Sequence, residues 1–202
     1  MSEKEKQLKE IKVILLGDSG VGKTSIINRY INNKFLHNSD STLGSNFLTK
    51  EIVKGNITYK LDIWDTSGQE RYRSVTNLFI KGSNIVLLVY SIDSLQSFES
   101  LEYWYSSLKD IMEGDYYVLG IVGSKFDLVN NEAVPEEKAK AFAKEKNASF
   151  NLVSAKEFPE GIEKLFNTLL DELIKRNYTD EPEKVVNIDK TEVKKNKKKK
   201  CC

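Results

Sequence analysis

A run of eight residues near the N-terminus combines three glycines with a lysine and a threonine, residue types suited to binding phosphate. The run is Gly17-Asp18-Ser19-Gly20-Val21-Gly22-Lys23-Thr24, which fits G-x-x-x-x-G-K-[ST] at every specified position. Glycines let the backbone wrap closely around phosphate oxygens with its N–H groups pointing inward. The Lys23 ammonium supplies positive charge, and the Thr24 hydroxyl is a hard oxygen ligand of the kind that Mg²⁺ prefers. The residues predicted to bind the phosphates are Ser19, Gly20, Val21, Gly22, Lys23, Thr24 and Ser25.

The segments on either side of this run have the composition of a buried strand and a helix. Residues 11–16 form a nearly continuous apolar run with β-branched residues, which predicts a strand buried on both faces. Residues 23–33 are helix-like, and the N-terminus of a helix adds partial positive charge toward a phosphate. A chance glycine-rich turn is the alternative, and this strand–loop–helix context disfavours it. The motif alone leaves open ATP or GTP, and a kinase, a motor or a switch.

A second polar segment follows a predicted strand and ends in glycine and glutamine. Its sequence is Trp64-Asp65-Thr66-Ser67-Gly68-Gln69-Glu70. An acid at a strand end partners a phosphate loop in holding Mg²⁺, here Asp65 through water. Gly68 can present its amide to a γ-phosphate, and the neutral Gln69 can orient an attacking water through hydrogen bonds. An ordinary exposed turn of small polar residues is the alternative.

Two further segments carry residues that distinguish guanine from adenine. In Ser124-Lys125-Phe126-Asp127, the Asp127 carboxylate can accept both the ring N–H and the exocyclic amine of guanine, a pair that adenine lacks. The Lys125 stem can cover the plane of the base. Ser154-Ala155-Lys156 would close the base pocket through the backbone amide of Ala155. Each segment alone is a weak signal, but their order and their positions at strand ends favour a guanine nucleotide.

The elements that must position these segments alternate between strands and helices. We predict strands over residues 11–16, 47–53, 57–64, 85–90, 118–123 and 150–153, and helices over 23–33, from about 94, from about 135 and over 161–175. Residues 47–53 and 57–64 flank Lys54-Gly55-Asn56 and predict an antiparallel hairpin. The predicted fold is therefore α/β, with a six-stranded, mostly parallel sheet, one antiparallel hairpin strand and helices on both faces.

Composition bounds the domain organisation. The chain has 202 residues, 40% of them hydrophobic and 30% charged, which suits one soluble domain with room for a tail. No apolar run approaches the ~18 residues of a membrane-spanning helix. We expect a short flexible N-terminus (residues 1–7), a globular domain (8–176) and a disordered tail (177–202). Both cysteines lie at the end of the tail, so a disulfide scaffold is excluded and a cytosolic compartment is expected.

Over residues 8–176 these motifs resemble the Ras superfamily of small GTPases, and within it most closely the Rab family, whose small G-protein fold the predicted sheet matches. By this resemblance, Thr42 in Ser41-Thr42-Leu43-Gly44 is the first-switch threonine that binds Mg²⁺ and senses the γ-phosphate, and Phe35 is the aromatic residue that lies against guanine. The segment from Trp64 to Tyr72 is similar to the Rab second switch, with Ser67 where alanine is usual.

The resemblance also identifies a protein-binding surface. Phe47, Trp64 and Phe79 fall on the hydrophobic triad that Rab effectors recognise, with Phe79 in place of the commoner tyrosine. Residues 45 and 46 differ from the usual pair after Thr-x-Gly. Tyr90-Ser91-Ile92, followed by Ser97-Phe98, also resembles the family.

The function implied is a GTP-binding and GTP-hydrolysing switch that recruits effectors in intracellular vesicle traffic. Lys23, Thr42 and Gln69 would be the catalytic residues, and Thr42 and Gly68 would lose their contacts when the γ-phosphate leaves. No arginine in cis is evident, so hydrolysis should be slow without a GTPase-activating protein. The expected partners are guanine nucleotide, an exchange factor, an activating protein, a dissociation inhibitor and effectors, with no nucleic acid, and the chain is expected to be a monomer.

The tail predicts membrane attachment. From Asn177 onward it holds eight lysines and five acidic residues, a net charge of +3, against −2 for the rest of the chain. Cys201-Cys202 resembles the Rab ending on which both cysteines are geranylgeranylated. Two lipid chains anchor stably where one is marginal, and each lysine near an anionic leaflet adds about 1 kcal/mol. The expected location is the cytoplasmic face of an intracellular membrane, in exchange with cytosol. A solvated charge run or a nucleic-acid patch is the alternative.

Ser124 departs from the family, which usually has asparagine there to bond guanine N7 and to tie the base loop to the phosphate loop. We therefore expect weaker nucleotide binding by up to ~1–1.5 kcal/mol, or about tenfold. A second hypothesis is then a nucleotide-binding module that cycles poorly. A P-loop nucleotide kinase is disfavoured, because it needs a lid and an acceptor site for which the short connections leave little room.

Overall fold

The computed structural model describes residues 7–35, 45–66 and 78–176, apart from the side chains of residues 45 and 46. Its sheet has six strands in the order β2-β3-β1-β4-β5-β6. The strands are β1 (Gln7–Leu16), β2 (Ser45–Lys54), β3 (Ile57–Thr66), β4 (Ile85–Ser91), β5 (Val118–Ser124) and β6 (Ser149–Leu152). The pair β2–β3 is antiparallel and the other pairs are parallel, which confirms the predicted sheet.

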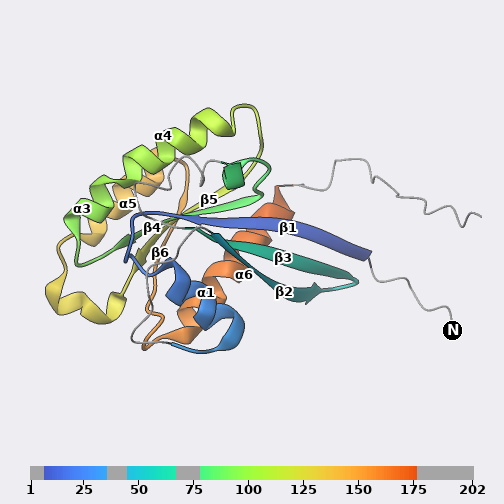
Figure 1. Ribbon diagram of the computed structural model, residues 1–202, viewed down its shortest axis with the longest axis horizontal. Helices are drawn as coiled ribbons and strands as arrows, with labels where there is room; N and C mark the ends of the chain where they lie inside the picture. The colour runs from blue at the N-terminus through green and yellow to red at the C-terminus, as the bar shows by residue number, and fades with distance from the viewer. Residues whose placement is uncertain (1–6, 36–44, 67–77, 177–202) are drawn as a thin grey trace, which may run out of the picture.

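Helices cover both faces of the sheet (Figure 1). The helices are α1 (Lys23–Asn32), α3 (Leu95–Glu99), α4 (Leu101–Ile111), the 3-10 helix η2 (Phe126–Asn131), α5 (Glu136–Glu145) and α6 (Pro159–Lys175). Helices α1 and α6 lie on one face, and α3, α4 and α5 lie on the other. The α/β fold with helices on both faces is therefore confirmed.

The central strands are buried on both sides, as their continuous apolar runs predict. All seven residues of β4 are buried, and so are all seven of β5. Side chains alternate between the faces, so Val13 and Leu15 of β1 join the core beneath α1 and α6, while Ile14 and Leu16 join the core beneath α3, α4 and α5. The sheet thus lies between two apolar cores.

Two predicted elements differ from the structure by more than a shift of one or two residues at a boundary. Strand β1 begins at Gln7 rather than Ile11, because β3 extends far enough to pair with it from Ile57 onward. The length of β1 is thus set by its partner and not by its own apolar residues. The single helix predicted from about residue 94 is two helices, α3 and α4, and Ser100 is both the C-cap of α3 and the N-cap of α4.

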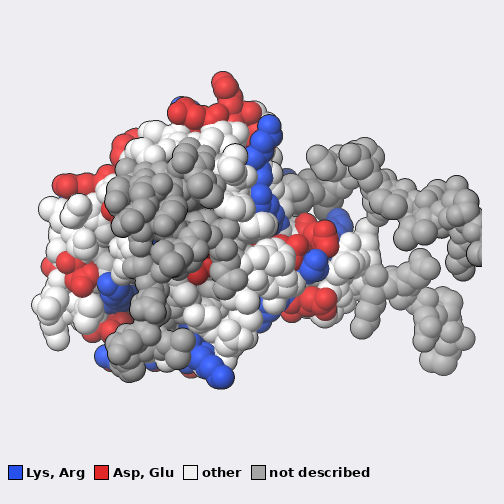
Figure 2. Space-filling view, viewed as in Figure 1, with Lys and Arg blue, Asp and Glu red and all other residues white. Residues whose placement is uncertain are grey.

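Charged side chains of both signs are interspersed on the face of the molecule shown in Figure 2, where described residues are in view. Among the described residues, no helix combines the length and the apolar character needed to cross a lipid bilayer.

Candidate nucleotide-binding site

The described residues predicted to bind nucleotide gather at one edge of the sheet. The phosphate loop (residues 17–24) follows β1, Asp65 is the last residue but one of β3, Ser124 ends β5 and Ser154 follows β6. These strands are mutually parallel, so their carboxyl ends meet at the same edge. That edge is where open α/β sheets bind ligands.

Two glycines in the phosphate loop are required by its geometry. Gly17 has φ of 145°, and a Cβ there would lie 2.1 Å from the carbonyl oxygen of Val89. Gly22 is the N-cap of α1, in the left-handed region with φ of 95°. Residues with side chains rarely adopt that conformation, so the loop reaches the start of α1 by a path that favours glycine.

Lys23 is a buried cation whose hydrogen bonds are made to the loop itself. Its Nζ donates to the carbonyl oxygens of Gly17 at 2.7 Å and Asp18 at 2.8 Å. Burial lowers the pKa of Lys23 to about 8, against the opposing influence of the nearby Asp65 and Asp18 carboxylates. A phosphate at the loop would favour the charged lysine, so this group is set up to bind an anion.

Thr24 and Asp65 place two hard oxygens side by side next to Lys23. The Thr24 hydroxyl donates to Asp65 Oδ2 at 2.7 Å. The end of β3 is fixed against β1 because the hydroxyl of Thr66 donates to the carbonyl oxygen of Leu15 at 2.6 Å. Magnesium is typically held by one or two protein oxygens together with substrate phosphates, so this pair fits Mg²⁺. Among the described residues, no larger metal-binding group of His, Cys, Asp and Glu occurs.

Ser124 joins the base end of the site to the phosphate loop. Its buried hydroxyl lies within hydrogen-bond distance of the carbonyl oxygens of Val21 and Tyr90, the latter at 2.8 Å. A hydroxyl carries one proton, so it donates to one of these carbonyls at a time. Although serine is shorter than asparagine, the Ser124 hydroxyl still connects the base segment to the phosphate loop at Val21.

Asp127 is held by the loop that follows β6. Its Oδ1 accepts a hydrogen bond from the hydroxyl of Ser154 at 2.6 Å, and the ammonium of Lys156 lies 4.0 Å from its Oδ2. The backbone N–H of Phe126 donates to the carbonyl oxygen of Val153 at 3.1 Å, which fixes the end of β5 beside β6. The two predicted base segments therefore lie together, and Ala155 is buried in the core beneath α1 and α6.

Two helix residues that the motifs did not indicate hold these loops in place. The indole N–H of Trp104 in α4 donates to Asp18 Oδ1 at 3.0 Å, and Arg29 of α1 donates to the carbonyl oxygen of Ala155 at 2.7 Å. The partners are 86 and 126 residues apart in the chain. No local pattern signals such pairs, because only the packing of helices on the sheet brings them together.

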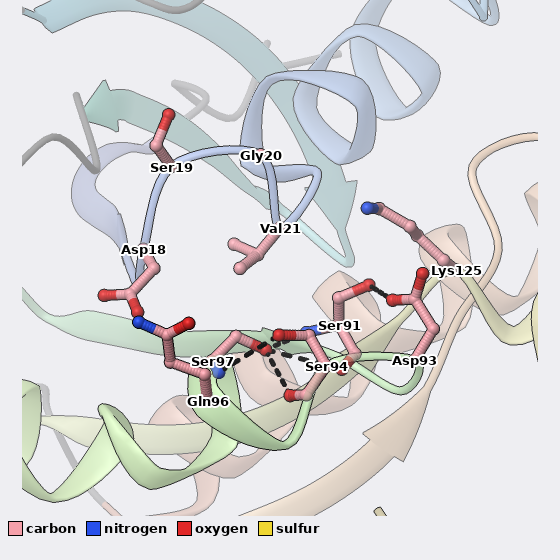
Figure 3. A pocket seen from close by; sticks show the side chains of 10 residues that line it. All are labelled: Asp18, Ser19, Gly20, Val21, Ser91, Asp93, Ser94, Gln96, Ser97 and Lys125. Carbon is pink, nitrogen blue, oxygen red and sulfur yellow. Dashed lines mark hydrogen bonds between the residues drawn. The ribbon is translucent and has the colours of Figure 1, made fainter. Parts of the chain in front are cut away.

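A cavity of about 540 Å³ adjoins the phosphate loop, a size usual for small-molecule sites. In Figure 3 the loop arches over it with Val21 pointing inward, and Lys125 stands at another side. Its lining residues are Asp18, Ser19, Gly20, Val21, Ser91, Asp93, Ser94, Gln96, Ser97 and Lys125. The polar residues that follow β4 were not predicted to line the site, although their position at a strand end could have indicated them.

The three aromatic residues predicted to contact effectors form one cluster. Phe47 and Trp64 are register partners in the β2–β3 pair, with ring centroids 5.2 Å apart. Phe79 stacks on Trp64 at 5.0 Å. Phe47 remains 45% exposed, so the cluster presents apolar surface to solvent.

The remaining predicted residues are placed less fully. Phe35 is partly buried and packs against the core beneath α1 and α6, and Ser25 lies in the first turn of α1. Several predicted residues lie outside those that the structure describes: Thr42, Gly68, Gln69, Cys201 and Cys202. Their roles stay predictions.

The fold and the site together define a P-loop nucleotide-binding protein. A model of the Ras family matches residues 12–175. The chain is 40% identical over 164 residues to the GTP-binding protein ypt3 of Schizosaccharomyces pombe, covering 81% of this chain and 76% of that protein. It is 36% identical over 182 residues to the Ras-like GTP-binding protein RYL2 of Yarrowia lipolytica, covering 87% and 86%. The chain therefore belongs to the Ras family, as a small GTPase of the Rab and Ypt type.

Proposed function

We propose that the chain binds GTP and GDP with Mg²⁺, hydrolyses GTP and acts as a switch in vesicle traffic. The observation that carries this proposal is the meeting, at one sheet edge, of the Lys23–Thr24–Asp65 group with Asp127. The first group suits a nucleoside polyphosphate, and Asp127 suits guanine. The names of the two relatives, both GTP-binding proteins, support it.

The base end provides the selectivity. Guanine offers a ring N–H and an amine side by side, and the two oxygens of Asp127 can accept both. Guanine O6, next to the ring N–H, is a hydrogen-bond acceptor, and a backbone N–H of the loop at residues 154–156 can donate to it. Adenine presents neither pattern, so a site built for these hydrogen bonds rejects ATP strongly.

The hydrolysis step rests on residues around the γ-phosphate. Lys23 stabilises negative charge on the phosphates, and Gln69 orients the attacking water. Bound Mg²⁺ supplies further charge neutralisation. Thr42 and Gly68 contact the γ-phosphate and lose those contacts when it is released, which changes the surface that partners recognise. Without an arginine in cis the rate is slow, and an activating protein raises it.

The Phe47–Trp64–Phe79 cluster, in which Phe47 is exposed, serves as the effector surface. It lies on and beside the β2–β3 hairpin, and Phe47 and Trp64 are close in sequence to the predicted switch segments. An exchange factor and a dissociation inhibitor complete the set of regulators. The chain works as a monomer, with no role in binding nucleic acid.

Cys201 and Cys202 carry the membrane anchor, as prenylated cysteines beside a lysine-rich run. The protein then cycles between cytosol and the cytoplasmic face of an intracellular membrane. Changing both cysteines to serine should move the protein wholly to the soluble fraction of fractionated cells. Persistent membrane association of that variant would refute the anchor.

The test of the switch is turnover of GTP by purified protein with Mg²⁺, beside a Gln69→Leu variant and with ATP as control. We expect slow, GTP-specific release of phosphate that the substitution abolishes, because leucine cannot orient water. Binding of GTP without turnover by the unmodified protein would favour the poorly cycling module instead.

A further inference from the structure

Arg29, in the last turn of α1, holds two separate segments with one guanidinium. Its Nε donates to the carbonyl oxygen of Ala155 at 2.7 Å, and its Nη2 lies 3.4 Å from the carbonyl oxygen of Lys156. Its Nη1 donates to the backbone oxygen of Asn33 at 3.0 Å and to the side-chain oxygen at 3.2 Å. All three guanidinium nitrogens are therefore engaged with protein oxygens.

The first of these segments is the loop expected to contact the base. Its two backbone carbonyls face the planar fork of Arg29, a geometry that lysine cannot match. On the other side, Ser154 is fully buried and donates to Asp127, so the loop is held from α1 and from Asp127. The position of the Ala155 and Lys156 backbone thus depends on two side chains from outside the loop.

The second segment is the end of α1. Asn33 caps the helix in the left-handed region with φ of 50°, and its N–H donates to the carbonyl oxygen of Arg29. The chain then runs two residues further to Phe35, the aromatic residue assigned to the guanine. The same guanidinium therefore holds Asn33, from which the chain reaches Phe35, and also holds the backbone of Ala155 and Lys156.

We propose that Arg29 is a positioning residue for guanine recognition, which holds the backbone of Ala155 and Lys156 where an N–H group meets O6 of the base. This proposal rests on the proposed binding of guanine nucleotide. It makes the hydrogen bond from the loop backbone to O6 depend on Arg29, and leaves the ring N–H and amine of guanine to Asp127. Loss of Arg29 would let the loop move away from O6 while Asp127 still accepts its two hydrogen bonds.

The test compares three nucleotides by competition for the full-length protein with Mg²⁺. GDP offers all three contacts, 6-thio-GDP replaces O6 with a sulfur that accepts hydrogen bonds weakly, and IDP lacks the amine. We expect Arg29→Ala to lower GDP affinity roughly 3- to 10-fold and to shrink the preference for GDP over 6-thio-GDP by a similar factor. The preference for GDP over IDP should stay unchanged.

Two further variants sharpen the result. Arg29→Lys keeps the charge but loses the fork, so its preference for GDP over 6-thio-GDP should lie between those of the unmodified protein and Arg29→Ala. Arg176→Ala, which removes an arginine at the end of α6 paired with Glu172, should match the unmodified protein.

A merely structural role would weaken all three nucleotides by the same factor, and that outcome, or an unchanged preference for GDP over 6-thio-GDP, would overturn the proposal. Failure of the unmodified protein to prefer GDP over ADP would instead overturn the proposed function, and the role of Arg29 with it.

Discussion

The phosphate end and the base end of the candidate site are built differently. At the phosphate end, Lys23 bonds to carbonyls five and six residues before it, within one loop. At the base end, Ser124 reaches a carbonyl 103 residues away and Arg29 one 126 residues away. The Lys23 contacts of the phosphate end are therefore local, although Asp65 and Trp104 also reach that end from 41 and 86 residues away, whereas both of these base-end contacts join distant segments.

Helix α1 connects the two ends. It begins with Lys23 and Thr24 at the phosphate end, and Arg29 near its end holds the base loop. Ser124 provides a second connection, from the base segment to Val21 of the phosphate loop. A local motif can fix where phosphate binds, but retention and selection of the base depend on these links between distant segments.

The largest expected effect follows from removing the charge at the phosphate end. Lys23→Ala should weaken binding of GDP and GTP by at least about 100-fold, because a charged donor to the phosphates is lost. Equilibrium titration with a fluorescent guanine nucleotide measures this. Lys164→Ala, at an exposed position of α6, is the control and should bind like the unmodified protein. Full binding by Lys23→Ala would show that the phosphate loop does not bind the phosphates of the nucleotide.

Removing the hydroxyl that ties the two ends should have a smaller effect. Ser124→Ala leaves the carbonyls of Val21 and Tyr90 without that donor, and we expect labelled GDP to leave roughly 5-fold faster. Ser124→Asn restores the family residue and should slow release by up to about tenfold.

Ser149→Ala is a matched control for the serine substitution. The Ser149 hydroxyl is also buried, but it has no hydrogen-bond partner among the described residues. Its removal should leave GDP release unchanged. Equal release rates for Ser124→Ala and the unmodified protein would mean that the link between the ends does not control retention.

The contacts of the candidate site differ in how well the sequence predicts them. The roles of Lys23, Thr24 and Asp65 follow from local spacing, because a loop between a strand and a helix has few geometries and a strand end has a known place in a parallel sheet. Arg29 and Trp104 carry no such signal, since their partners are set by how α1 and α4 pack on the sheet. The extension of β1 to Gln7 was missed for the same reason, because it depends on the length of β3.

The smallest expected effect is a pH dependence at the phosphate end. In the nucleotide-free fold the pKa of Lys23 is about 8, below its ordinary value of 10.5. Between these values the unfolded chain binds the extra proton, so the free-energy cost of burying this group falls, and stability rises, as pH increases from about 8 to 10.5. Bound phosphate restores the charged lysine, so nucleotide binding should take up part of a proton at pH 8.5 and little at pH 7.

Calorimetric titration in two buffers with different ionisation enthalpies measures this uptake. Lys23→Arg, which stays charged, should show none beyond that of the nucleotide itself. Equal uptake by both proteins at pH 8.5 would contradict the assignment to Lys23.

We propose that one guanine nucleotide spans both ends of the site, with its phosphates at Lys23 and its base at Asp127. The most direct test is competition of GDP and ADP for the purified protein with Mg²⁺ present. We expect GDP to displace a labelled guanine nucleotide at a concentration at least roughly 1,000-fold lower than ADP, because buried groups that match guanine are left unpaired by adenine. Displacement by both nucleotides at similar concentrations would contradict it.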